Sequence, residues 1–260
     1  MDLGITALDT SFNYRGFTSH AMLAAVVGDL LPRFTVSTKV GYFPMPGAAE
    51  HSLAPARLRA ALEQTNRDLG RPPDVAFLHN PEASLQEPSD RPTQLLAGAC
   101  AALAEATAAG LCEAWGISSW NPRALVGLTG STDPAPAVLM VRAGLLVGSD
   151  VLDAAETVAS QWGLPPQARW GMSPFGGNTT DPVWSAFDPR LFLKGDADLS
   201  RAQAAFRASF LLPQVASVAV GADDPEHLRQ LVNCLDHAVD EELLEQYRQL
   251  LRTRSGPHVV

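Results

Sequence analysis

Four ionisable side chains stand near the ends of apolar runs within the first eighty residues: Asp9, Tyr14, Lys39 and His79. A tyrosine hydroxyl donates a proton more readily when an ammonium group lies beside it, and a buried lysine requires a carboxylate partner such as Asp9. A histidine can orient a substrate carbonyl or share the proton. Together these residue types predict acid–base chemistry on a small molecule.

The segments that carry these side chains predict buried strands of a parallel sheet. Each is a short run of apolar and β-branched residues that ends in polar residues, at 5–14, 34–41 and 75–81. In a parallel barrel the C-terminal ends of the strands meet at one mouth. Side chains that are far apart in the sequence are therefore expected to converge there.

Strand and helix patterns alternate along the rest of the chain, which is typical of βα units. Strands are predicted at 114–122, 137–141, 169–173 and 215–220, and helices at 19–31, 54–69, 93–109, 150–162, 200–210 and 241–252. Ser19 and Asp224 are predicted N-caps. Residues 41–47 and 82–92 are expected to be loops, and 179–199 a lid. No repeat or composition break divides residues 1–260, so one domain is predicted.

Three motifs resemble the aldo-keto reductase family: Asp9-Thr10 with Asn13-Tyr14, Ser37-Thr38-Lys39, and Leu78-His79-Asn80-Pro81. The resemblance implies an α/β fold of the TIM-type (β/α)8 barrel, with Tyr14 as proton donor and with Lys39, Asp9 and His79 as catalytic partners. Taken alone, Lys39 and Asp9 could form an ion pair at the barrel end without a catalytic role, and His79 could be a core histidine. The presence of all four in order favours the family.

Later segments are similar to the family's cofactor-binding stretches, at 114–122, 173–178 and 221–228. They imply a nicotinamide cofactor, NADP or NAD, bound by Ser118, Ser119, Met140, Met172, Ser173, Gly221 and Ala222. Aromatic residues of the mouth loops are the candidates for substrate binding: Phe12, Tyr42, Trp120 and Phe175. A role in loop packing is the alternative for each of them.

The chain departs from the family in length. Only eight residues precede Asp9, and seven strands are predicted where a closed barrel needs eight, so the first strand–helix unit is missing from the pattern. A late start codon, a naturally incomplete barrel and a neighbouring chain that covers the gap are all open explanations. The last of these favours a homo-oligomer.

The cofactor pocket departs as well. Met172 stands where the family stacks a tyrosine on the nicotinamide, Met140 replaces a glutamine, and Asp223 replaces a basic residue near the 2′-phosphate. A carboxylate beside a phosphate is repulsive, so NADPH is expected to bind poorly. Gly221 and Ala222 still offer backbone N–H groups at a helix N-terminus. Binding of no cofactor is therefore an alternative.

Composition limits the class of function. The net charge of −9 argues against nucleic acid and anionic membranes as partners. No apolar run approaches the roughly 20 residues of a membrane span, and no signal peptide is evident. Three cysteines without CxxC spacing predict neither a disulfide framework nor a metal site. The expected location is the cytoplasm.

Three functions follow from these observations. The first is an NAD(P)-dependent oxidoreductase that reduces a carbonyl or oxidises a sugar-type alcohol. The second is a cofactor-independent acid–base enzyme on the same scaffold (a lyase, dehydratase, isomerase or cyclase) that uses Tyr14, Lys39 and His79. The third, a non-catalytic binding subunit, is disfavoured by the four retained residues.

Overall fold

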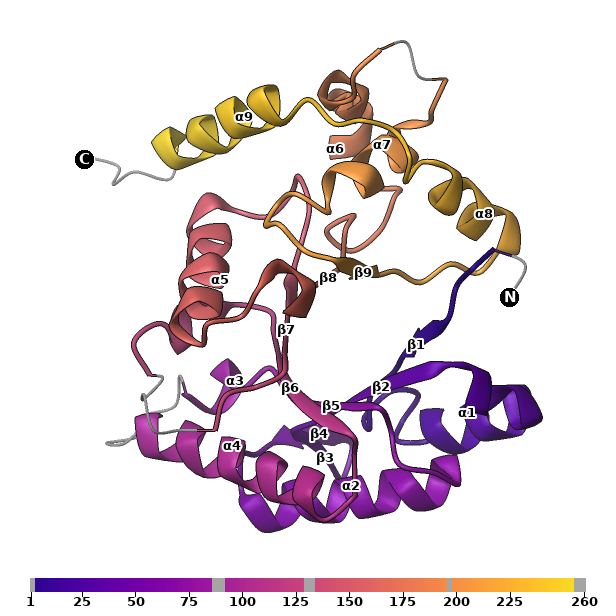
Figure 1. The fold of residues 1–260 in the computed structure, drawn as a ribbon, viewed down its shortest axis with the longest axis vertical. Helices are drawn as coiled ribbons and strands as arrows, with labels where there is room; N and C mark the ends of the chain where they lie inside the picture. Colours follow the sequence, from indigo (N-terminus) through magenta and orange to yellow (C-terminus); the bar gives the residue numbers. More distant parts are fainter. Residues whose placement is uncertain (1–2, 86–91, 129–133, 196–197, 255–260) are drawn as a thin grey trace. The chain divides into compact units, whose positions relative to one another are not determined.

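The computed structural model describes residues 3–85, 92–128, 134–195 and 198–254 (Figure 1). The chain divides into two compact units, Met1–Met140 and Val141–Val260. Within the described ranges, every helix is too short or too polar to cross a membrane. Part of the predicted loop at 82–92 and part of the predicted lid lie outside the described residues.

Seven strands form one sheet in the order β1-β2-β5-β6-β7-β8-β9. All seven coincide with predicted strands, and the fold class is the predicted α/β fold of TIM-barrel type. The ladders β1–β2, β2–β5, β5–β6 and β8–β9 are parallel. The bounds of the strands are β1 (Ala7–Asp9), β2 (Thr35–Val40), β5 (Val75–His79), β6 (Ala114–Ser119), β7 (Val138–Arg142), β8 (Arg169–Met172) and β9 (Ser217–Ala219).

Helices follow the strands, as the alternating pattern predicts. In the first unit α1 packs against α2, and α2 packs against α4. The apolar stripe of α2 is buried, including Leu58, Leu62 and Leu69. The helices are α1 (Ser19–Val27), α2 (Pro55–Leu69), α3 (Glu82–Leu85), α4 (Pro92–Ala108), α5 (Ser149–Gln161), α6 (Val183–Ala186), α7 (Arg201–Ala208), α8 (Pro225–Asn233) and α9 (Glu241–Arg254), with 3-10 turns η1 (Gly28–Arg33), η2 (Pro122–Leu125), η3 (Pro166–Ala168) and η4 (Pro189–Phe192).

Two local predictions about helix α1 are wrong. The α-helix ends at Val27, and Gly28, with φ 42°, starts a 3-10 turn in place of the last helical turn. Thr18 is the N-cap residue, and the Ser19 hydroxyl donates to the carbonyl of Ser11 at 2.8 Å. Ser19 therefore ties α1 to the loop after β1. The predicted cap at Asp224 is confirmed, since its side chain accepts from the Glu226 N–H.

The predicted loop after Lys39 is a β-hairpin. Strands β3 (Tyr42–Met45) and β4 (Ala48–His51) pair antiparallel, with Tyr42 opposite His51. In the predicted lid, the described residues include α6 and η4. The hairpin and the predicted lid both contain prolines, and their apolar runs are short, so their sequence patterns resemble those of loops.

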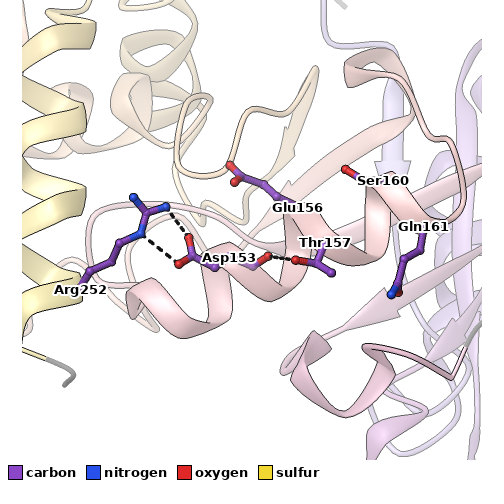
Figure 2. A pocket seen from close by; sticks show the side chains of 6 residues that line it. All are labelled: Asp153, Glu156, Thr157, Ser160, Gln161 and Arg252. Carbon is purple, nitrogen blue, oxygen red and sulfur yellow. Dashed lines mark hydrogen bonds and ion pairs between the residues drawn. The ribbon is translucent and has the colours of Figure 1, made fainter. Parts of the chain in front are cut away.

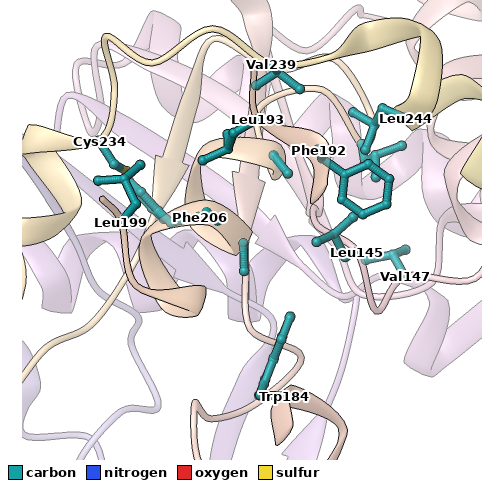
Figure 3. Close-up of a cluster of buried hydrophobic side chains, with 14 of the residues drawn as sticks. Leu145, Val147, Trp184, Phe192, Leu193, Leu199, Phe206, Cys234, Val239 and Leu244 are labelled. Atoms are coloured by element: carbon teal, nitrogen blue, oxygen red, sulfur yellow. The ribbon is translucent and has the colours of Figure 1, made fainter. Parts of the chain in front are cut away.

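The second unit has a core of its own (Figure 3). Phe192, Leu193, Leu199 and Phe206 are buried there together with Leu244 of α9. The Tyr247 hydroxyl donates to the carbonyl of Leu145 at 2.7 Å. Helix α9 is thus fixed to the start of this unit by apolar packing and by one partly buried hydrogen bond.

Candidate active site

An ion pair between Asp9 and Lys39 forms the base of the candidate active site. The strands β1 and β2 place Asp9 opposite Ser37, and Lys39 follows two residues later on the same face. The Lys39 ammonium contacts one carboxylate oxygen of Asp9 and donates to the carbonyl of Thr10 at 3.0 Å. Ser37 donates to the other Asp9 oxygen at 2.7 Å. Because Lys39 is only 2% exposed, this pairing compensates a buried charge.

Tyr14 lies above that lysine. The Lys39 ammonium nitrogen is 5.3 Å from the centre of the Tyr14 ring, and the ring is exposed to solvent. The chain then turns through Arg15, Gly16 and Phe17, whose φ angles are 51°, 62° and 69°. Two non-glycine residues in this region are strained, and such strain is concentrated at functional sites. The turn reverses the chain between Tyr14 and α1.

His79 closes the set at the end of β5. It is buried, its Nδ1 lies 3.1 Å from the Ser11 hydroxyl, and its ring meets the Tyr14 ring edge-on at 6.2 Å. Burial, together with the charges of Lys39 and His51, lowers the pKa of His79 to about 3. The imidazole is therefore neutral at physiological pH. Nε2 is the ring nitrogen not engaged by Ser11.

Ser11 was not predicted from the sequence. Its hydroxyl also lies 2.6 Å from Oδ1 of Asn13 and 3.2 Å from the carbonyl of Lys39. It therefore links the tyrosine loop, the lysine strand and the histidine. Its position two residues after Asp9, in the same polar loop, was the available signal.

The hairpin β3–β4 adds a second aromatic wall beside His79. The Tyr42 ring lies edge-on between His79 and His51, at 5.0 Å and 4.8 Å. Nε2 of His51 is 2.8 Å from the carbonyl oxygen of His79. Gly41, with φ 152°, permits this approach, because a Cβ there would lie 2.9 Å from that same carbonyl. Tyr42, a predicted substrate residue, thus borders the set.

The exit of β6 carries Ser118, Ser119 and Trp120. Both serines are fully buried, whereas Trp120 is 44% exposed. The buried Glu82 accepts from the Ser119 hydroxyl at 3.0 Å and from the backbone N–H groups of Trp120 and Asn121 at 2.7 Å and 2.8 Å. Glu82 was expected in a loop and was not predicted to have a role.

The remaining predicted residues of the first unit are Phe12 and Met140. The Phe12 ring is half-buried and packs against the rings of Phe17 and Phe43, at 5.5 Å and 6.4 Å between centres. Met140 is fully buried in β7. Both positions are consistent with packing.

Five predicted residues belong to the second unit. Met172 ends β8, Ser173 follows it with φ 55°, and Phe175 packs against Trp184 and Phe206. Gly221 and Ala222 are exposed before α8, beside the exposed Asp223. Arg229 forms an ion pair with Glu226 on the same helix. The structure thus brings Asp9, Tyr14, Lys39, His79 and Tyr42 together in the first unit.

A surface hollow of about 610 Å³ lies in the second unit (Figure 2). Asp153, Glu156 and Arg252 line it, together with polar residues of α5, and Arg252 is paired with Asp153 at 2.7 Å. A hollow of about 480 Å³ in the first unit is lined by Arg71, Cys112 and their neighbours. None of the predicted site residues lines either one. In the described part of the chain, no group of three His, Cys, Asp or Glu side chains could hold a metal ion.

Ionisable side chains thus gather at the strand ends of a parallel α/β fold of TIM-barrel type. The model of the aldo/keto reductase family matches residues 1–156. Because this is more than half of the chain, the protein belongs to the aldo/keto reductase family. Members of this family are oxidoreductases that act on small carbonyl compounds.

Solved structures show the same fold. The holo form of an aldo-keto reductase from Bacillus halodurans has a TM-score of 0.73 at 18% identity, over 96% of this chain and 83% of that one. An aldo-keto reductase from Klebsiella pneumoniae in complex with NADPH has 0.69 at 20%, over 96% and 81%. One from Brucella melitensis has 0.65 at 16%, over 96% and 86%. A comparison with curated proteins found no match.

Proposed function

We propose that the protein reduces a small carbonyl compound, or oxidises a sugar-type alcohol, with NADH or NADPH. Tyr14 donates the proton in reduction and accepts it in oxidation. The observation that carries this proposal is the Lys39 ammonium, which lies 5.3 Å from the Tyr14 ring centre and is paired with Asp9. A fixed positive charge favours the phenolate that remains after proton donation.

His79 has a different role in this proposal. An imidazole with a pKa of about 3 is neutral at physiological pH, so it orients the substrate oxygen and does not supply the proton. Ser11 holds Nδ1, which makes Nε2 the nitrogen for the substrate. Asp9 keeps Lys39 in place without touching the substrate.

The residues present fit a nicotinamide cofactor by the chemistry of their donors. The exposed Trp120 ring at the β6 exit offers a flat surface, and the exposed backbone of Gly221 and Ala222 precedes the nine-residue helix α8. When bound, the nicotinamide would supply or accept the hydride. In the first unit, the exposed Trp120 would pack against its ring end. In the second unit, the exposed Asp223 lies beside Gly221 and Ala222, where its carboxylate would repel a 2′-phosphate, so NADH is the expected preference.

The decisive experiment is a fluorescence or calorimetric titration with NADH and NADPH, followed by turnover of aldehyde and sugar substrates. We expect binding in the micromolar range, tighter for NADH. Tyr14→Phe should lower turnover by about 10²- to 10⁴-fold with unchanged cofactor binding. Tyr247→Phe is the matched control, because Tyr247 belongs to the core of the second unit. Full activity of Tyr14→Phe would exclude the proposed proton donor.

A second candidate is a cofactor-independent lyase, dehydratase, isomerase or cyclase. Its support is the full burial of Ser118 and Met140, two residues that the cofactor would have to touch. This function needs only Tyr14, Lys39 and His79. If neither nucleotide binds at millimolar concentration, the redox proposal is excluded and this second candidate is favoured.

A further inference from the structure

A buried carboxylate joins the ends of two neighbouring strands. Glu82 is 5% exposed and lies three residues after His79, at the start of α3. One of its oxygens, Oε1, accepts from the backbone N–H groups of both Trp120 and Asn121, and Oε2 accepts from the Ser119 hydroxyl. Three neutral donors from one segment thus converge on one side chain.

This arrangement fixes the β6 exit against the β5 exit. The strands are already in register, with His79 opposite Ser118, and the Asn80 N–H donates to the carbonyl of Ser118 at 2.7 Å. Asn80, with φ 48°, turns the chain so that Glu82 comes back over the neighbouring strand end. Helix α3 also packs against η2, which begins directly after Asn121.

We propose that Glu82 is a positioning residue that holds the segment 119–121 at a fixed distance from His79, and that it thereby sets the affinity for the nicotinamide ring. The inference rests on the proposed cofactor-dependent function. A backbone segment without this anchor would have to be ordered by the ligand itself, and that ordering weakens binding. None of the three hydrogen bonds of Glu82 involves Asp9, Tyr14, Lys39 or His79, so the proton-transfer step is not expected to change.

The test uses Glu82→Ala, Glu82→Gln and Ser119→Ala in the full chain, with cofactor affinity measured by NADH fluorescence titration. Glu82→Ala leaves the backbone N–H groups of Trp120 and Asn121 without their carboxylate acceptor, so the dissociation constant should rise about tenfold. Glutamine keeps an oxygen at the Oε1 position, and its amide can donate to the Ser119 hydroxyl. Glu82→Gln should therefore stay within about threefold of the unmodified chain, and Ser119→Ala should fall between the two.

Glu63→Ala is the control, because Glu63 pairs with Arg59 on the exposed face of α2. All titrations are made well below the melting temperature of each variant. Turnover at saturating cofactor should be unchanged in Glu82→Ala. If Glu82 had a purely structural role, its substitution would lower the melting temperature and leave the dissociation constant for the cofactor unchanged. Unchanged affinity in folded Glu82→Ala would overturn this inference alone. No nucleotide binding by the unmodified chain would overturn it together with the proposed function.

Discussion

Two buried histidines of the first unit are kept uncharged by the fold. His79 lies at the strand ends, and His20 of α1 lies against Thr38 of β2, with its Nε2 2.7 Å from the threonine hydroxyl. Burial lowers the pKa of His20 to about 4 and that of His79 to about 3. Protonation of either ring therefore opposes folding.

The sign of the resulting pH dependence follows from these pKa values. The unfolded chain takes up protons on both histidines near pH 6.5, whereas the folded chain does so only near pH 4 and 3. Their contribution to stability is present above pH 6.5 and is lost as the pH falls. Between pH 7 and 5 we expect the free energy of unfolding to drop by about 2 kcal/mol for each histidine.

Urea unfolding at several pH values measures this slope. His20→Gln should remove about half of the combined slope of the two histidines. His227→Gln is the control, because His227 is exposed on α8 and should leave the slope unchanged. If the free energy of unfolding of His20→Gln depends on pH as steeply as that of the unmodified chain, the contribution assigned to His20 is wrong.

The sequence predicted the four ionisable residues because each lies at or just beyond the end of a recognisable strand. The contacts of Ser11, His51 and Glu82 were not predicted, because they form between strand ends that are distant in the sequence. Glu82 is the first residue of a predicted loop in the sequence, and only the register of β5 and β6 brings it to Ser119.

At the scale of the elements, charged side chains connect α5 and α9 in the second unit. Arg248 is nearly buried and bonds to both Asp153 and Glu156 at 2.6 Å, whereas Arg252 is more exposed and bonds to Asp153. The hydrogen bond from Arg252, and those from Arg248, lower the pKa of Asp153. The two arginines make the same kind of contact in different surroundings.

Their substitutions should therefore differ in cost. Arg248→Ala leaves two carboxylates without their shared cation and should lower the free energy of unfolding by about 2 kcal/mol. Arg252→Ala, at an exposed pair, should cost less than about 1 kcal/mol. Urea unfolding at pH 7 compares them, and equal losses would show that burial does not determine the strength of these ion pairs.

Among the elements, the hairpin β3–β4 shows where prediction failed. Pro44, Pro46 and Gly47 are typical of loops, and the segment has no clear alternation. In the structure Met45 pairs with Ala48, so Pro46-Gly47 forms a two-residue turn with Gly47 at φ 77°. That dipeptide favours a tight turn and was the available signal.

At the scale of the whole molecule, one domain remains the prediction from the sequence, alongside a homo-oligomer and a cytoplasmic location. The chain forms two compact units, and the second has its own core. If they behave as one domain, strand β5 and helix α5 should lose protection against hydrogen exchange at the same urea concentration. Mass spectrometry of the exchanged peptides measures this. Separate midpoints would show two domains.

The seven strands of the main sheet could be predicted because each strand is a local pattern. The geometry of a cofactor pocket could not, since it depends on how distant loops meet. Met140 illustrates the limit: a family position suggested a cofactor contact, and the side chain is fully buried.

The acid–base set and its anchor come from one continuous stretch, Asp9 to Asn121, within the first compact unit. Gly221 and Ala222, the predicted phosphate contacts, come from the other unit. Under the proposed function, mutations in the last third of the gene would change the coenzyme preference while the residues proposed for proton transfer are inherited intact. For an engineer, this makes the two halves separate targets for library design.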